Sequence, residues 1–335
     1  MKLAFFSARP YDVQSFESVY AKSFSSKFEV TFHAFRLSTE TAMLARDTDA
    51  VCVFVNDPLG PDLLKQLHGY GVRAVLLRCS GYNAVDLKAA EELGIMVANV
   101  PGYSPESIAE FAVAQIQTLN RKTHRTYNRV REGNFTLDGL LGFTLCGRTV
   151  GIIGTGRIGV ACARILHGFG CNVLGYDLYP NAAFKEYGTF ADLDTLLTQS
   201  DIVSLHCPLT ESTRHLVDSS FLTKMKKGAM LVNTSRGALI DTSAVITSLK
   251  SGHLGGLALD VYEGEELVFY HDHSGKIIAD DVLMRLMTFP NALVSGHQAF
   301  FTEESLAQIA ETTLGNMEAF VQGTVCKNAL TKATK

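Results

Sequence analysis

Three side chains suited to proton transfer and anion binding stand at separate points in the second half of the chain. Arg236 lies in the run Asn-Thr-Ser-Arg-Gly, Glu265 in Glu-Gly-Glu-Glu, and His297 in Gly-His-Gln-Ala-Phe. A guanidinium can grip a carboxylate with two parallel hydrogen bonds and polarise a neighbouring carbonyl. An imidazole can donate or accept a proton near neutral pH, and a paired carboxylate would orient it and raise its pKa. Together these groups could protonate or deprotonate a small anionic carbonyl compound.

Each of the three residues has a simpler interpretation when it is taken alone. An arginine after a strand commonly makes a surface ion pair, Glu265 could be one solvated acid of an acidic cluster, and His297 could be a core histidine. Each residue, however, follows a predicted strand. The carboxyl ends of strands in an open α/β sheet face the ligand crevice. This shared position favours the interpretation that Arg236, Glu265 and His297 act together in catalysis.

A glycine-rich turn between a strand and a helix is the clearest motif of the chain. Thr149–Ile153 predicts a short buried strand, and Gly154-Thr-Gly-Arg-Ile-Gly159 follows it directly. The next helix repeats apolar residues on one face at helical spacing. This is the context of a dinucleotide-binding turn, in which Gly154 permits the turn, Gly156 lets the backbone approach a pyrophosphate, and Gly159 lets the helix pack on the strand.

An acidic residue ends the second strand of the same unit. Asp177 closes the predicted strand that begins at Cys171, 18 residues after Gly159. Its carboxylate would accept hydrogen bonds from the adenosine ribose and repel a 2′-phosphate, which favours NAD over NADP. Amides at the N-terminus of the intervening helix would face the phosphates.

Alternating strand and helix patterns place these residues in parallel α/β sheets. Helix-like stretches at Pro61–Leu67 and Ala84–Leu93 lie between apolar runs rich in β-branched residues, as in βαβ units. The predicted strands are 3–7, 30–35, 50–55, 74–79 and 95–100 in the first part of the chain, and 149–153, 171–177, 202–206, 229–233, 256–260 and 292–295 in the second.

The pattern changes near residue 101. Pro101-Gly-Tyr is a breaker, and Ser104-Pro-Glu supplies an N-cap followed by a proline at the first helical position, so a long helix is expected there. The polar, glycine-punctuated stretch Arg125–Leu145 predicts a loop-rich connection. A C-terminal helix over about Glu303–Gln322 is expected to pack back onto the first unit.

Composition excludes several classes of protein. The chain has 335 residues, a formal net charge of −4 and no basic block, which argues against a nucleic-acid partner. No apolar run approaches the ~18 residues of a membrane-spanning helix, and the N-terminus lacks the apolar stretch of a signal peptide. The seven cysteines lack the close, paired spacing of disulfide frameworks and structural zinc sites. This indicates reduced thiols and a cytoplasmic protein. His271 and His273 are interpreted as part of a solvated loop, and no metal is expected.

Taken with the glycine turn, three downstream segments resemble the D-isomer-specific 2-hydroxyacid dehydrogenases. These segments are 233–237, 260–266 and 296–301, and the resemblance covers essentially the full length. Within this family, the chain resembles the NAD-dependent D-lactate dehydrogenase branch. The features that carry this closer resemblance are Arg9, Tyr103, the Gly-His-Gln-Ala-Phe run and the acidic run before Phe269. The resemblance implies reversible hydride transfer between NADH and pyruvate, giving D-lactate. It also implies a homodimer or homotetramer that uses the Ser104–Leu145 stretch.

The resemblance further assigns individual site residues. The family's catalytic set falls on Arg236, Glu265 and His297. The implied substrate-binding residues are Arg9, Ser80, Gly81, Tyr103, Arg236 and Phe300. The implied cofactor-binding residues are Gly154, Gly156, Arg157, Ile158, Gly159, Asp177, Cys207, Pro208, Thr213, Thr234, Ser235 and Asp260. Cys207 departs from the family, which often has an aliphatic residue there; its thiol could confer sensitivity to oxidation or, as buried neutral cysteines usually are, be inert.

The sequence thus predicts two Rossmann-like or flavodoxin-like doubly wound parallel-sheet domains, with the active site in the cleft between them. Residues 1–101 and 300–335 would form a discontinuous substrate-binding domain, and 102–299 the NAD-binding domain. Two other functions stay open: a dehydrogenase for a bulkier 2-keto acid, and a non-catalytic NAD sensor of the corepressor type. Tyr103, Phe300 and Phe301 favour a small substrate.

Overall fold

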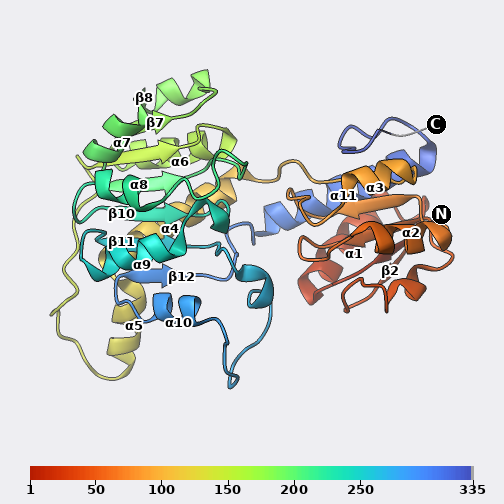
Figure 1. Ribbon diagram of the computed structural model, residues 1–335, viewed down its shortest axis with the longest axis horizontal. Helices are drawn as coiled ribbons and strands as arrows, with labels where there is room; N and C mark the ends of the chain where they lie inside the picture. Colours follow the sequence, from red (N-terminus) through yellow and green to blue (C-terminus); the bar gives the residue numbers. More distant parts are fainter. Residues whose placement is uncertain (333–335) are drawn as a thin grey trace. The chain divides into compact units, whose positions relative to one another are not determined.

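The computed structural model describes residues 1–332 and divides them into two compact units (Figure 1). Unit 1 consists of Met1–Ser104 and the segment from Phe301 onward, and unit 2 of Pro105–Phe300. Each unit contains one sheet in which all neighbouring strands are parallel. The predicted fold class, two parallel-sheet α/β domains, is confirmed.

Unit 1 is built on a five-stranded sheet in the order β2-β1-β3-β4-β5. Its central strands are apolar and fully buried, because helices cover both faces of a parallel sheet. The strands are β1 Lys2–Phe5, β2 Glu29–Phe32, β3 Ala50–Val53, β4 Ala74–Leu77 and β5 Met96–Ala98. The helices are α1 Pro10–Ser23, the 3₁₀ turn η1 Ala42–Ala45, α2 Pro61–Gly69, α3 Leu87–Glu92 and α11 Glu303–Gln322.

The C-terminal helix belongs to unit 1, as predicted. In Figure 1, α11 lies beside α1 although the two are at opposite ends of the chain. The hydroxyl of Thr302 caps α11 by accepting from the N–H of Ser305, and the helix ends at Gly323 in the left-handed region (φ +63°). Both signals are local, which explains why the sequence predicts the ends of this helix well.

Unit 2 is built on a seven-stranded sheet in the order β12-β11-β10-β9-β6-β7-β8. The strand order reverses between β6 and β9, and in doubly wound sheets ligands bind beyond the carboxyl ends of the strands at such a point. The strands are β6 Thr149–Ile153, β7 Asn172–Tyr176, β8 Thr189–Phe190, β9 Ile202–Leu205, β10 Met230–Asn233, β11 Gly256–Leu259 and β12 Ala292–Val294.

The helices of unit 2 connect these strands. The α-helices are α4 Pro105–Arg121, α5 Thr123–Arg131, α6 Arg157–Gly168, α7 Leu193–Gln199, α8 Ser219–Lys224, α9 Thr242–Lys250 and α10 Asp281–Met287. The 3₁₀ turns are η2 Ala182–Glu186, η3 Gly237–Leu239 and η4 Glu265–Leu267.

One predicted loop is partly wrong. The stretch Arg125–Leu145 was expected to be loop-rich, but Arg125–Arg131 is helical and forms most of α5. The helix has no buried residue and follows Lys122, which lies in the left-handed region (φ +53°). A mostly polar helix that buries no residue lacks the extended apolar stripe from which helices are recognised in a sequence.

In the part of the chain that the structure describes, no helix is long and apolar enough to cross a membrane. All seven cysteines lie within this part and are present as free thiols.

Candidate active site

His297 and Glu265 form a direct hydrogen-bonded pair in unit 2. Nδ1 of His297 lies 2.8 Å from Oε1 of Glu265, and the two side chains are only 18% and 17% exposed. The second carboxylate oxygen of Glu265 accepts from the backbone N–H of Tyr262 at 2.9 Å. The loop after β11 therefore orients the carboxylate, which engages Nδ1 and directs Nε2 of the imidazole away from Glu265.

The backbone around His297 is held by the carboxyl end of β11. His297 lies in the left-handed region (φ +53°), and its N–H donates to the carbonyl of Asp260 at 2.8 Å. The carboxylate of Asp260 is fully buried and accepts from the N–H groups of Gln298 and Ala299. It also accepts from the hydroxyl of Ser295 at 2.6 Å. Asp260 thus fixes the histidine loop, while its predicted contact with the cofactor stays a prediction.

Two aromatic side chains flank the imidazole of His297. The ring of Tyr270 lies 5.9 Å from it, centroid to centroid, and the ring of Phe300 lies 6.3 Å away in an edge-on arrangement. The hydroxyl of Tyr270 donates to the carbonyl of His297 at 3.3 Å. Phe300 was predicted as a substrate-pocket residue. Tyr270 was missed, because no spacing in the sequence links it to the histidine.

Arg236 follows β10 in a loop that packs closely on the loop of Glu265. A Cβ placed on Gly237 would lie 2.1 Å from the carbonyl carbon of Tyr262, so only glycine permits this approach. Nη1 of Arg236 donates to the carbonyl of Ser235 at 2.7 Å. The three predicted catalytic residues therefore follow β10, β11 and β12, which are neighbours in one sheet.

The three glycines of the turn after β6 differ in what surrounds them. Gly154 is left-handed (φ +96°), and a Cβ there would lie 2.5 Å from the amide nitrogen of Cys207. A Cβ on Gly159 would lie 2.0 Å from the carbonyl oxygen of Gly154. Gly156, in contrast, has no atom within 4 Å of the position of a Cβ. The fold itself thus requires the first and third glycines, whereas the second borders open space, as a close-approaching pyrophosphate needs.

Asp177 is anchored to this turn. Its Oδ2 accepts from the N–H and the hydroxyl of Thr155, at 2.5 Å and 3.0 Å, and its Oδ1 accepts from the N–H of Tyr179. Thr155 is fully buried and was not singled out in the sequence. The carboxylate that is predicted to bind the ribose is therefore fixed in orientation beside the glycine turn.

Two buried polar atoms beside the ends of β9 and β10 have no hydrogen-bond partner among the described residues: Oγ1 of Thr234 and Nδ1 of His206. Burial lowers the pKa of His206 to about 4, so its imidazole is neutral at pH 7. Buried polar atoms are nearly always paired in folded proteins, so these two fit a site that a polar ligand completes. Thr234 was predicted from the resemblance, whereas His206 was missed.

The remaining predicted cofactor residues join neighbouring loops. The hydroxyl of Ser235 donates to the carbonyl of Cys207, and that of Thr213 to the carbonyl of Pro208. Burial raises the pKa of the Cys207 thiol to about 11, so it is protonated at neutral pH and a poor target for oxidation. Arg157 and Ile158 open α6 directly after Gly156, the N-cap of that helix.

Four of the predicted substrate residues belong to unit 1. Arg9 is the N-cap of α1, just after β1, while Ser80 and Gly81 follow β4. Tyr103 follows β5 near the end of the unit 1 segment. Since β1 and β4 are parallel members of one sheet, Arg9 and the 80–81 loop lie at its carboxyl edge.

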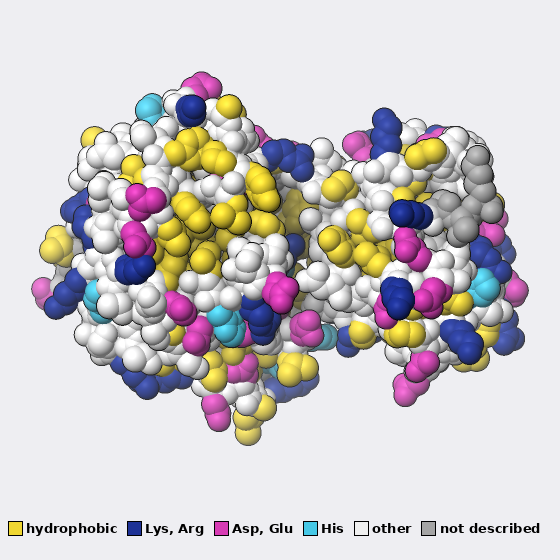
Figure 2. All heavy atoms as spheres, turned by 45° about the horizontal axis from the view of Figure 1, so that its top comes forward, with side chains coloured by type: hydrophobic (Ala, Val, Ile, Leu, Met, Phe, Trp, Pro, Cys, Tyr) yellow, Lys and Arg dark blue, Asp and Glu magenta, His cyan; other side chains and the backbone are white. Residues whose placement is uncertain are grey.

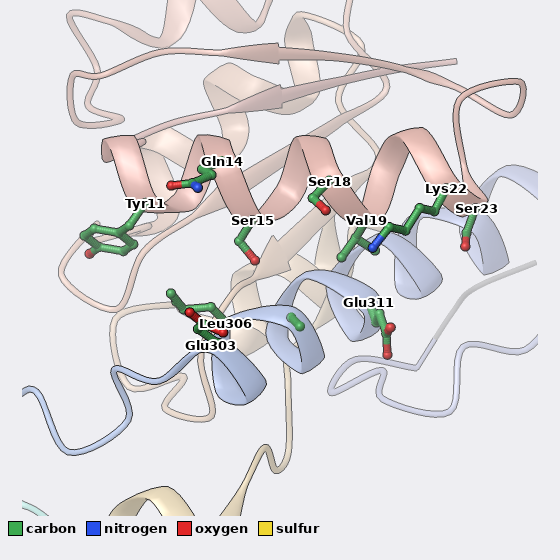
Figure 3. Close-up of a pocket in the computed structure, with 11 residues that line it drawn as sticks. Tyr11, Gln14, Ser15, Ser18, Val19, Lys22, Ser23, Glu303, Leu306 and Glu311 are labelled. Carbon is green, nitrogen blue, oxygen red and sulfur yellow. The ribbon is translucent and has the colours of Figure 1, made fainter.

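A pocket of about 380 Å³ in unit 1 lies apart from these residues, between α1 and α11 (Figure 3). Ser15, Ser18 and Lys22 line it from one helix, and Glu303 and Glu311 from the other. None of the predicted site residues lines it.

His271 and His273 lie in the loop before α10. Across the described residues, no group of three or more His, Cys, Asp or Glu side chains is arranged to hold a metal ion.

The protein is a dinucleotide-dependent dehydrogenase. Its class follows from the glycine turn, the fixed acid after β7 and the loops that carry Arg236, Glu265 and His297. The chain belongs to the D-isomer-specific 2-hydroxyacid dehydrogenase family, whose NAD-binding-domain model matches residues 113–299. The predicted family and the predicted cofactor, NAD, are both confirmed.

Similar proteins carry related names. The chain is 63% identical over 332 residues to "2-hydroxyacid dehydrogenase A" of Aspergillus oryzae, covering 99% of this chain and 96% of that protein. It is 62% identical over 331 residues to "D-lactate dehydrogenase kk1H" of Curvularia clavata, covering 98% and 95%. The apo-structure of D-lactate dehydrogenase from Escherichia coli superimposes with a TM-score of 0.91 at 47% identity, covering 98% of this chain and all of that one.

The glycine turn allows cofactor binding to be separated from folding. We expect Gly156→Ala to weaken NADH binding about tenfold or more, because its methyl group would enter the space left for the phosphates. The melting temperature should stay unchanged, because that methyl group meets no protein atom within 4 Å. Fluorescence titration with NADH and thermal unfolding measure the two effects.

Gly159→Ala is the matched control, because its methyl group would collide with the carbonyl oxygen of Gly154. It should lower the melting temperature. An unchanged NADH affinity in Gly156→Ala would contradict the proposed position of the pyrophosphate.

Proposed function

We propose that this chain is an NAD-dependent D-lactate dehydrogenase that reversibly reduces pyruvate to D-lactate. The observation that carries the proposal is the 2.8 Å pair of His297 and Glu265, beside the loop of Arg236, in a 2-hydroxyacid dehydrogenase. The D-lactate dehydrogenase name of a relative that is 62% identical over nearly the whole chain supports the substrate.

The side chains divide the work of the reaction. Bound NADH supplies the hydride for the carbonyl carbon. Nε2 of His297 donates a proton to the carbonyl oxygen during reduction and takes it back during oxidation. Glu265 fixes the ring through Nδ1, and Arg236 binds the substrate carboxylate and polarises the carbonyl.

The cofactor would be held along the carboxyl edge of the unit 2 sheet. The N-terminal amides of α6, which begins after Gly156, would bind the pyrophosphate, and Asp177 the ribose hydroxyls. Because Thr155 and Tyr179 hold the Asp177 carboxylate, it cannot easily turn away from a 2′-phosphate. This supports a preference for NAD over NADP. Oγ1 of Thr234 offers a further contact.

In unit 1 we assign the substrate carboxylate to Arg9 and the backbone amides of Ser80 and Gly81. The support is their shared position at the carboxyl edge of the unit 1 sheet. Tyr103 and Phe300 would limit the size of the substrate side chain.

The cysteine usage supports a cytoplasmic location. All seven thiols are free in the described structure, and five of them are buried: Cys52, Cys162, Cys171, Cys207 and Cys326. Reduced, unpaired cysteines in this number are typical of proteins kept in a reducing compartment.

A panel of 2-keto acids tests the proposed activity. With NADH, we expect kcat/KM to be highest for pyruvate and lower for branched or aromatic 2-keto acids, and chiral analysis should identify the product as D-lactate. Loss of NADH absorbance measures turnover. A clear preference for a branched substrate would instead make the chain a dehydrogenase for bulkier 2-keto acids. Folded, NADH-bound protein without turnover on any member would indicate an NAD sensor.

His297→Asn tests the proton-transfer role with little disturbance of the backbone, since Asn tolerates the left-handed region better than most residues. We expect kcat to fall by roughly 10²- to 10⁴-fold, because a general acid–base group is lost. NADH affinity should stay within a few-fold of the wild type. His271→Asn, which changes an exposed histidine of the same unit, should keep full activity. Loss of NADH binding in His297→Asn would mean that the imidazole has a structural role instead.

We further propose that the chain forms a homodimer or homotetramer through the Ser104–Leu145 segment. Phe135, Leu137 and Leu141, in the connection after α5, are 73%, 83% and 90% exposed. Figure 2 shows that hydrophobic side chains gather into a patch on the visible surface. Exposed apolar groups of this kind mark interaction surfaces.

Sedimentation velocity measures the assembly. We expect a dimer or tetramer for the wild type and a smaller mass for the double variant Phe135→Ser/Leu141→Ser, because the exposed apolar area is removed. A wild type that sediments as a monomer would contradict the proposal. Tyr179→Ser, which changes an exposed aromatic outside the segment, serves as the control.

A further inference from the structure

A buried arginine lies at the carboxyl end of the unit 1 sheet and has no part in the mechanism described above. Arg78 follows β4 directly and is 3% exposed. Its guanidinium carbon lies 4.6 Å from the ring centroid of Phe5 and 4.7 Å from that of Phe54. Burial of a guanidinium is unfavourable unless its donors are paired, so the partners of Arg78 show what the charge stabilises.

The partners of Arg78 lie in the segment that joins β1 to α1. Nη1 donates to the carbonyl of Phe6 at 3.1 Å, and Nη2 donates to the carbonyl of Ser7 at 2.7 Å. Nε makes no hydrogen bond among the described residues, but it lies 3.4 Å from Oδ1 of Asp12, with which it forms a buried ion pair.

The two carbonyls belong to the peptide groups on either side of Ser7. Ser7 lies in the left-handed region (φ +53°), which is unfavourable for a serine and persists only where neighbouring contacts hold it. Its hydroxyl donates to Oδ1 of Asp57, whose Oδ2 accepts from the N–H of Phe54. Arg78 thus holds the carbonyl groups of the peptides before and after Ser7, whose N–H groups donate to the carbonyls of Phe35 and His33.

Asp12 links the guanidinium of Arg78 to the backbone of Arg9. Oδ2 of Asp12 accepts from the backbone N–H of Arg9 at 3.0 Å and lies 3.5 Å from Nη2 of Arg78. The guanidinium therefore orients the carboxylate that fixes the backbone of Arg9, the N-cap of α1.

We propose that Arg78 is the positioning residue of the substrate-carboxylate site in unit 1. It sets the course of the Ser7–Arg9 segment and also begins the loop that contains Ser80 and Gly81, so one buried charge holds both parts of that site in register. The proposal rests on the function proposed above for Arg9, Ser80 and Gly81. It adds a residue that contacts no substrate and acts only through the backbone.

Arg78→Lys tests the proposal because it keeps the positive charge but replaces the planar fork by a single point donor. An ammonium cannot bind both carbonyls and the carboxylate in the same geometry. We expect KM for pyruvate and the inhibition constant of oxamate, a pyruvate analogue, to rise by ~10- to 100-fold, because small misplacements of binding groups are costly. The decrease in kcat should be smaller, and NADH affinity should be unchanged because the cofactor residues are in unit 2.

Thr331→Val is the matched control for lost stability. Thr331 is buried in unit 1, where its hydroxyl oxygen accepts from the N–H of Val97 and donates to the carbonyl of Ile95. This variant should lower the melting temperature and leave KM unchanged, because it does not touch the Ser7–Arg9 segment.

An Arg78→Lys variant that loses stability as Thr331→Val does, with KM and the oxamate constant unchanged, would show that Arg78 is only structural and overturn the proposal. If Arg78→Lys does not fold, Asp12→Asn replaces it. In this variant the amide oxygen can still accept from the N–H of Arg9, but the ion pair with Arg78 is lost. A KM that stays at the wild-type value would again overturn the proposal. Failure of pyruvate as a substrate would refute only the lactate assignment, and the same comparison would then use the best 2-keto acid of the panel.

Discussion

The buried carboxylate of Asp260 holds the loop of His297 in a conformation that the loop would not keep alone. His297 lies at φ +53°, a region that costs a residue with a side chain about 1–3 kcal/mol. Asp260 accepts from two amides and one hydroxyl, and a hydrogen bond to a charged group contributes about 1.5–3 kcal/mol. These bonds outweigh the strain. The distance from the imidazole to Glu265 is therefore set by the backbone at the ends of β11 and β12.

A steric constraint plays the corresponding part at the glycine turn after β6. Gly154 is in contact with the loop after β9, and Gly159 with the carbonyl of Gly154, so β6, α6 and that loop meet at distances that admit no side chain. The close packing leaves Gly156 as the one glycine of the motif that faces open space. The motif thus combines two glycines that build the turn with one that leaves room for a ligand, although all three residues are of the same type.

The features that could be predicted from the sequence are those that depend on local signals. The glycine turn, the acid at Asp177 and the positions of Arg236, Glu265 and His297 after strands could be predicted, because each depends on signals a few residues away. The contacts of Tyr270 with His297 and of Thr155 with Asp177 could not, because they join segments 27 and 22 residues apart with no fixed spacing. The helix α5 was missed for a related reason: its residues make no buried contacts that would leave a periodic pattern.

Each of the two units uses a buried ion to hold one strained backbone segment, and the two ions have opposite charge. In unit 2 a buried carboxylate accepts from backbone N–H groups beside His297, and in unit 1 a buried guanidinium donates to the backbone carbonyls around Ser7. A carboxylate can only accept and a guanidinium can only donate, so each ion selects one kind of backbone group and thereby one conformation of the segment. In both units the ion comes from the end of a strand, β11 or β4, and the held residue is a left-handed one after another strand, β12 or β1. A strained turn places a side chain beyond the strand end, and an ion buried in the same unit makes that placement stable.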